Sequence, residues 1–163
     1  MIKLKVYLDT SVVSHLLADD APEQQNDTLK LWLQLKQDEY DAVVSPVVYE
    51  EIEGCDEDLG TQLLRNLNEL NPTNAEETME TRILANEYLR TGILKQKSLN
   101  DCRHIAIASI YGCKYILSWN MKHFVKRRTI EMVQNINRNL GIIQPSILTP
   151  AIFIEGDDEG EDI

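Results

Sequence analysis

The first ten residues constrain this chain more than any other segment. Residues 2–8 alternate apolar and polar side chains, and this period of two predicts a β-strand. Asp9 follows directly, and Thr10 or Ser11 can cap a helix that begins next. Ligands of open α/β sheets bind in the crevice outside the carboxyl ends of the strands. Asp9 is therefore a candidate metal ligand, and a plain turn-forming role is the alternative.

Strand-like and helical segments alternate along the rest of the chain. Further strands are expected at 41–45, 114–119 and 142–148, and helices at 12–18, 23–36, 46–54, 58–70, 75–90, 98–111 and 128–140. Pro145 cannot donate to a sheet ladder, so the last strand is expected at an edge. The alternation predicts an α/β fold, a three-layer α/β/α sandwich with a central, mainly parallel sheet of four to five strands.

A chain of 163 residues can bury a core of its own as one domain. We expect this domain over residues 1–150, followed over 151–163 by an acidic tail that has little to bury and is disordered. No run approaches the ~18 apolar residues that a membrane span needs. The chain also enters a strand without a leader, so we expect a cytoplasmic protein with no membrane partner. Its three cysteines lack the number and spacing of a disulfide framework or a zinc site.

Charge is segregated along the chain. The formal net charge of −11 by itself opposes nucleic-acid binding, because phosphate repels an acidic surface. Residues 88–130, however, hold nine basic side chains and one acid, so this stretch carries +8 and the remainder −19. A basic region on an acidic body favours local phosphate binding. The alternative is a solvated surface whose bias has no function.

Polar side chains that can hold a metal recur where the predicted strands end. Asp9 follows the first strand, and Glu51 lies on the helix after the second. Asp101 opens the most apolar helix, and Asn120 follows the next strand. The carboxyl ends of parallel strands meet at one edge of a sheet, where several carboxylates need a cation to offset their repulsion. Oxygen ligands of this kind select Mg²⁺ or Mn²⁺ rather than zinc.

Four short motifs follow one another along the chain. They are Leu8-Asp9-Thr10-Ser11, Ser45 with Glu51-Ile52, Asn100-Asp101 before Ile105-Ala106, and Leu117-Ser118-Trp119-Asn120 before Phe124. In this order and at these spacings they resemble the motifs of the PIN domain family, and the resemblance covers residues 2–150. It implies a PIN-like fold and a Mg²⁺- or Mn²⁺-dependent endoribonuclease, in bacteria most often the VapC-type toxin of a type II toxin–antitoxin pair. Such an enzyme hydrolyses RNA phosphodiesters with a metal-activated water.

The resemblance also assigns roles by position. It implies that Asp9, Glu51 and Asp101 bind the metal. It implies that Thr10 and Ser118 are supporting hydroxyls. The partners it implies are an RNA substrate, a small antitoxin protein that inserts a basic side chain into the acidic cleft, and a second copy in a homodimer.

Two adjacent glutamates compete for the second metal position. Glu50 and Glu51 point about 100° apart on a helix, so only one can face the edge of the sheet. We choose Glu51 because Ile52 beside it matches the family's Glu-Leu/Ile pair, which leaves Glu50 as the solvent-facing residue.

Asn120 departs from the family pattern, in which the fourth motif usually ends in Asp. Its amide oxygen can help at the catalytic site, but it brings no charge. Asp9, Glu51 and Asp101 then supply −3, enough for one firmly held divalent ion. The departure also favours an alternative function, a catalytically weakened or inactive PIN-like domain that binds RNA or a protein partner.

Basic residues after the third predicted strand are the candidates for contact with the RNA backbone. They are Lys122, His123, Lys126, Arg127 and Arg128. A simple exposed patch is the alternative. The three histidines, His15, His104 and His123, are too far apart in the pattern to predict a metal cluster, and each is expected to be a packing or surface residue.

Overall fold

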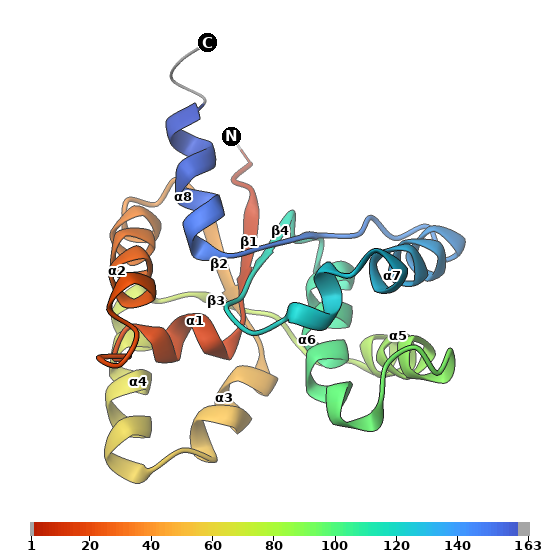
Figure 1. Cartoon of the computed structure of the whole chain (residues 1–163), viewed down its shortest axis with the longest axis horizontal. Helices are drawn as coiled ribbons and strands as arrows, with labels where there is room; N and C mark the ends of the chain where they lie inside the picture. The colour runs from red at the N-terminus through yellow and green to blue at the C-terminus, as the bar shows by residue number, and fades with distance from the viewer. Residues whose placement is uncertain (1, 160–163) are drawn as a thin grey trace.

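Five parallel strands form the centre of the molecule (Figure 1). This computed structural model describes residues 2–159, apart from the side chains of 123, 125 and 157–159. The strands are β1 (Lys5–Leu8), β2 (Asp41–Val44), β3 (Thr73–Asn74), β4 (Tyr115–Leu117) and β5 (Ser146–Leu148). Their order across the sheet is β3-β2-β1-β4-β5, which makes β1 the central strand.

The predicted parallel sheet is confirmed, with one strand that the sequence pattern did not show. β3 has only two residues and follows Asn71, which adopts a left-handed conformation (φ 54°) at the end of a helix. Two residues are too few to display a period of two. β5 pairs only with β4 and lies at the edge of the sheet, as Pro145 predicted.

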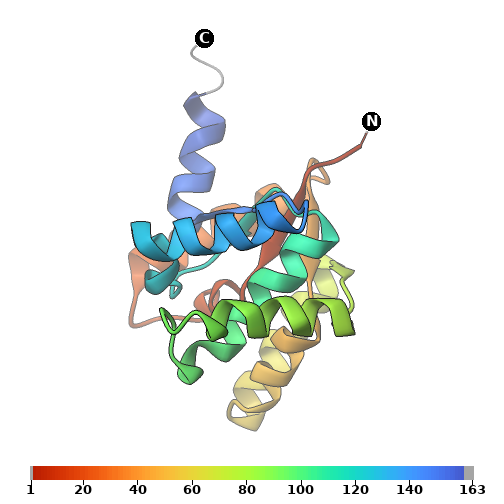
Figure 2. The ribbon, with the colours of Figure 1, turned by 90° about the vertical axis from the view of Figure 1, so that its right-hand side faces the viewer.

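Helices cover both faces of the sheet (Figures 1 and 2). They are α1 (Thr10–His15), α2 (Pro22–Lys36), α3 (Pro46–Glu53), α4 (Glu57–Leu70), α5 (Met79–Arg90), α6 (Leu99–Tyr111), α7 (Arg127–Asn139) and α8 (Pro150–Glu159), with short 3₁₀ turns η1 (Gln96–Ser98) and η2 (Lys122–Val125). Figure 2 looks onto the layer of α5, α6 and α7. The molecule is therefore the expected α/β/α sandwich.

The two layers have separate hydrophobic cores because successive strand residues point to opposite faces. Tyr7 of β1 packs in the core under α5, α6 and α7. Its neighbours Val6 and Leu8 pack in the core under α1, α2 and α4. Burial of β1 on both faces explains why it lies at the centre of a parallel sheet.

Helix α8 corrects the expectation of a disordered tail from residue 151. Pro150 starts this helix, and Phe153 is buried, with its ring against those of Tyr40 and Tyr115 (centroids 5.2 and 5.6 Å apart). The apolar residues 152–154 precede the acidic run, so this part of the segment does have surface to bury. Residues 160–163 lie outside the described part, and the domain boundary at residue 150 stays a prediction.

Within residues 2–159, the structure contains no helix with the length and apolar character that a bilayer-crossing segment requires.

Candidate metal centre

Asp9 lies at the carboxyl end of the central strand. Its backbone N–H donates to the carbonyl of Leu117 (3.0 Å), which continues the ladder between β1 and β4. Asp9 is the N-cap residue of α1, but its side chain makes no cap hydrogen bond and is turned to other partners. The carboxylate is nevertheless buried, with 5% of the residue exposed. The fold thus holds an acid at the edge where chemistry was expected.

Two hydroxyl groups hold one oxygen of Asp9. Ser11 Oγ donates to Oδ2 (2.7 Å), and Ser118 Oγ donates to the same atom (2.8 Å). Ser118 Oγ also accepts from the backbone N–H groups of Asn120 (3.0 Å) and Met121 (3.2 Å), so the turn after β4 fixes it. The second oxygen of Asp9, Oδ1, has no hydroxyl donor among the described residues and lies 3.3 Å from His104 Nε2.

Glu51, on α3, faces Asp9, whereas Glu50 does not. Thr10 Oγ1 donates to Glu51 Oε1 (3.0 Å), and His104 Nε2 lies 2.6 Å from the same oxygen. Glu50 instead pairs on the outside with Arg103 (3.0 and 3.2 Å). The geometry therefore agrees with the choice of Glu51 over Glu50 for the edge of the sheet.

The pKa of Glu51 is set by opposing effects. Partial burial acts to raise it, but the hydrogen bond and charge of His104, the hydrogen bond from Thr10 and the charge of Arg103 outweigh burial and lower the pKa below its ordinary value. Glu51 is therefore ionised at neutral pH, the form that binds a cation.

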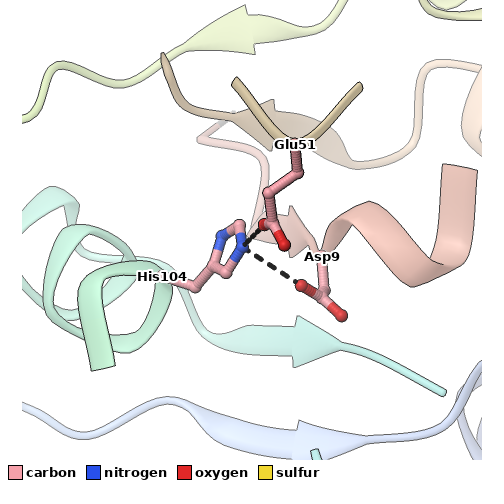
Figure 3. Close-up of side chains that lie close together, drawn as sticks. All are labelled: Asp9, Glu51 and His104. Atoms are coloured by element: carbon pink, nitrogen blue, oxygen red, sulfur yellow. Dashed lines mark hydrogen bonds and ion pairs between the residues drawn. The ribbon is translucent and has the colours of Figure 1, made fainter. Parts of the chain in front are cut away.

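His104 occupies the centre of the site, where a packing or surface residue was expected. Its Nε2 faces the carboxylates of both Asp9 (3.3 Å) and Glu51 (2.6 Å) (Figure 3). The residue is fully buried on α6, and its other ring nitrogen, Nδ1, lies 2.6 Å from the hydroxyl of Tyr7. One sequence signal was available: His104 follows Asp101 by three residues and so shares its face of the helix.

Asp101 lies in the first turn of α6, slightly apart from this cluster. Among the described residues, the ligand atoms within 4.8 Å of one another belong to Asp9, Glu51 and His104. Burial, followed by the charges of Asp9 and Glu51, raises the pKa of Asp101 to about 6, against the opposing effect of His104. Burial is the largest cause of this shift, and the negative charges of the two neighbouring carboxylates add to it.

Asn120 is exposed at the start of the turn after β4, next to Ser118. Its backbone N–H supports Ser118, which in turn donates to Asp9.

The residues present fit a divalent cation. Asp9 and Glu51 each have one oxygen fixed by two donors. Among the described residues, no hydroxyl donates to the second oxygen of either carboxylate. Asp101 adds a third carboxylate within electrostatic range. An oxygen-rich donor set with surplus negative charge is suited to a hard ion.

The predicted basic residues lie beyond the turn that follows β4. Lys122 is in η2, Lys126 precedes α7, and all the described side chains of the set are exposed. Arg127 pairs with Glu131 (3.0 Å) on the surface. The side chain of His123 lies outside the described residues. The structure therefore places the described members on one exposed segment near the acidic edge.

This fold and this acidic edge define a class of protein. The chain matches the family model of the PIN domain over residues 6–124, so it belongs to the PIN domain family. The sequence motifs predicted this family. No curated protein matches the chain at a significant level.

Solved structures with the same fold include three VapC or VapBC proteins. VapC20 of Mycobacterium tuberculosis, described as a Sarcin-Ricin loop cleaving toxin, is 15% identical with a TM-score of 0.57, over 72% of this chain and 92% of that one. VapBC2 of Rickettsia felis, bound to a promoter DNA fragment, is 13% identical (TM-score 0.54; 90% and 98% covered). DNA-bound VapBC of Salmonella typhimurium is 16% identical (TM-score 0.53; 90% and 98% covered). At these identities the likeness shows the fold.

Proposed function

We propose that this protein is a Mg²⁺- or Mn²⁺-dependent endoribonuclease of the PIN type and the toxin of a type II toxin–antitoxin pair. The observation that carries the proposal is the arrangement of Asp9 and Glu51. Each has one carboxylate oxygen that accepts from two donors. Asp101 lies close enough for the charges of Asp9 and Glu51 to raise its pKa. A chain with no cation to bind would gain nothing from this concentration of charge.

In this proposal Asp9, Glu51 and Asp101 hold the metal, and Asn120 assists with its amide oxygen. A bound divalent ion would supply a water of lowered pKa and charge stabilisation for the phosphate oxygens. The chain's own hydroxyls orient the acids: Ser11 and Ser118 fix Asp9, and Thr10 fixes Glu51. No side chain needs to act as a nucleophile.

Cleavage of a labelled structured RNA tests this proposal. We expect cleavage with Mn²⁺ or Mg²⁺ and none with excess EDTA, and re-addition of metal should restore it. Cleavage that persists in EDTA, or no cleavage of any RNA with either ion, would contradict a metal-dependent ribonuclease.

The toxin role is supported by the fold that this chain shares with VapBC proteins. We propose a small antitoxin that inserts a basic side chain between the acids, a homodimeric toxin, and a cytoplasmic location, where RNA is the substrate. The neighbouring reading frame tests the pairing. A short DNA-binding-type protein encoded there should relieve growth arrest when it is expressed together with this chain.

One metal ion should bind tightly in the absence of RNA. Asp9, Glu51 and Asp101 supply three negative charges, and Asn120 adds none, so a second divalent ion would leave the site positive. Isothermal titration with Mn²⁺ should give a stoichiometry of one per chain. Two tight sites in the RNA-free protein would contradict this expectation.

The basic segment should contribute to RNA affinity without sequence preference. Changing Lys126, Arg127 and Arg128 to Gln removes three exposed charges. If each contacts a phosphate, the slope of log affinity against log salt should become shallower by about 2, at roughly 0.7 per contact for a single strand. Binding is measured by fluorescence anisotropy in EDTA, where no cleavage is expected. The matched control removes the same charge from the opposite layer, at Lys30, Lys36 and Arg65, and it should leave the slope unchanged.

A second candidate function, a PIN-like domain that binds without cleaving, is favoured by Asn120. This residue is exposed at the rim and lacks the charge usual at its position in the family. Asn120→Asp separates the two functions. Increased cleavage by the variant identifies a weakened enzyme, whereas RNA binding without cleavage in either form identifies a binding domain.

A further inference from the structure

A line of hydrogen bonds runs from the core of the sheet to Glu51 through His104. Ser45 Oγ lies 2.7 Å from the hydroxyl of Tyr7, which lies 2.6 Å from His104 Nδ1. His104 Nε2 then lies 2.6 Å from Glu51 Oε1 (Figure 3). Ser45, Tyr7 and His104 are fully buried. The proposed reaction gives these three side chains no catalytic role, so their hydrogen bonds toward Glu51 need another explanation.

The chemistry of the partners fixes the direction of the hydrogen bond between His104 and Glu51. An ionised carboxylate only accepts, so the proton lies on His104 Nε2. Ser45 Oγ accepts from the backbone N–H of Val47 (3.2 Å) and can donate to Tyr7. The Tyr7 hydroxyl, whose pKa burial raises well above its ordinary value, keeps its proton and lies within hydrogen-bond distance of Nδ1. Every donor has an acceptor, and the line ends at Glu51.

Glu51 and Asp9 are held in the same manner. Oε1 of Glu51 accepts hydrogen bonds from Thr10 and His104. In the same way, Oδ2 of Asp9 accepts from Ser11 and Ser118. In both cases two donors occupy one oxygen. The other oxygen of Glu51, Oε2, is left for a cation, whereas that of Asp9, Oδ1, faces His104 Nε2 at 3.3 Å. Without His104, only one hydroxyl would hold the longer and more mobile side chain of Glu51.

We propose that His104 is a positioning residue, whose Nε2–H fixes the carboxylate of Glu51 and leaves Oε2 available to the metal. The proposal rests on the proposed metal site and extends it, because His104 belongs to none of the four motifs. It differs from direct ligation, in which Nε2 would have to lose its proton.

Two amide substitutions separate the two sides of the imidazole. In His104→Gln the side-chain amide reaches the position of Nε2 and can still donate to Glu51. In His104→Asn the amide lies near the position of Nδ1, so the variant keeps the Tyr7 side and loses the donor to Glu51. We expect Mn²⁺ affinity, measured by calorimetry without RNA, to stay near wild type in the Gln variant. It should fall by about 10–100-fold in the Asn variant, the usual effect of losing an outer-shell partner.

Equal losses in both variants would assign His104 a packing role, and no loss in either would also overturn the proposal. Thermal unfolding in EDTA checks that both variants fold. Tyr7→Phe should weaken Mn²⁺ binding in the same direction. Its matched control is Tyr88→Phe, which removes another buried tyrosine hydroxyl with a 2.6 Å hydrogen bond, to Asn137, and should not change Mn²⁺ affinity.

Spectroscopy tests the hydrogen bond itself. In the metal-free protein, nitrogen NMR of the imidazole should show a slowly exchanging proton on Nε2, which shifts in Glu51→Gln. A proton found only on Nδ1 would overturn the proposal, as would ¹⁴N coupling in the Mn²⁺ electron-spin-echo spectrum that is absent from His104→Gln. Wild-type protein that binds no divalent ion would instead contradict the proposed function, and the NMR result would still decide on the bond to Glu51.

Discussion

RNA cleavage is expected to fall by at least about 100-fold when Asp9 is replaced by Asn. The substitution keeps the size of the side chain but removes a charge from the centre of the site. Loss of an outer-shell partner typically reduces metal affinity or activity by about 10–100-fold, and a direct ligand should matter more. Initial rates on a labelled RNA with saturating Mn²⁺ measure the effect.

The fold should tolerate this change. The side-chain carbonyl of Asn at position 9 can still accept from Ser11 or Ser118, so thermal unfolding in EDTA should stay close to that of the wild type. The control is Asp58→Asn, which removes an exposed carboxylate from α4 and should cleave at the wild-type rate. If Asp9→Asn also cleaves at an undiminished rate, the metal site has been assigned to the wrong residues.

Asp101→Asn should stabilise the metal-free protein while it weakens metal binding. Burial and the charges of Asp9 and Glu51 raise the pKa of Asp101 from 3.8 to about 6, so the ionised group destabilises the fold at neutral pH. Allowing for solvent screening of this partly exposed side chain, the destabilisation is about 1–2 kcal/mol. For a domain of this size, its removal should raise the Tm in EDTA by about 2–8 °C.

Metal should reverse the order of stability. An ion at a hundred times its Kd adds about 2.7 kcal/mol, so Mn²⁺ should raise the Tm of the wild type by about 5–10 °C. The variant should show a much smaller rise at the same concentration. Such opposite effects in one variant are typical of groups kept for function at the expense of stability.

The pH dependence of stability tests whether ionised Asp101 destabilises the metal-free fold. Because the folded-state pKa of Asp101 lies above its unfolded value, the destabilisation is absent below about pH 4, develops up to about pH 6 and is constant above it. The difference in Tm between variant and wild type in EDTA should follow this course. If the variant is less stable than the wild type at pH 7, the ionised carboxylate of Asp101 does not destabilise the fold.

The sequence predicted the parts of this fold that depend on local pattern. The alternation in residues 2–8 predicted β1, and the position of Asp9 at its end followed from that strand. The 100° step between neighbouring helical residues predicted that only one of Glu50 and Glu51 faces the edge of the sheet. These inferences need only the geometry of one element, whereas the choice of Glu51 came from the family resemblance.

Features that depend on contacts between distant elements were not predicted. β3 forms because its two residues pair with Val43 and Val44. Two residues are too few for a periodic pattern that would predict a strand. His104 reaches Glu51 across 53 positions of the chain, and its spacing of three from Asp101 indicates only a shared helix face, not a contact with Glu51 on another helix. The helical start of the acidic segment was missed because Phe153 finds its partners on β4 and before β2.

The anchoring of α8 has a practical consequence for experiments on single molecules or on surfaces. Tyr40 precedes β2 and Tyr115 opens β4, so Phe153 docks at the amino ends of the strands, at the opposite end of the sheet from Asp9. In Figure 1 the helix extends away from the body on that side. A dye, or a tether to a sensor chip, attached at α8 would therefore lie at the other end of the sheet from the acidic edge and leave that edge open to RNA and to inhibitors.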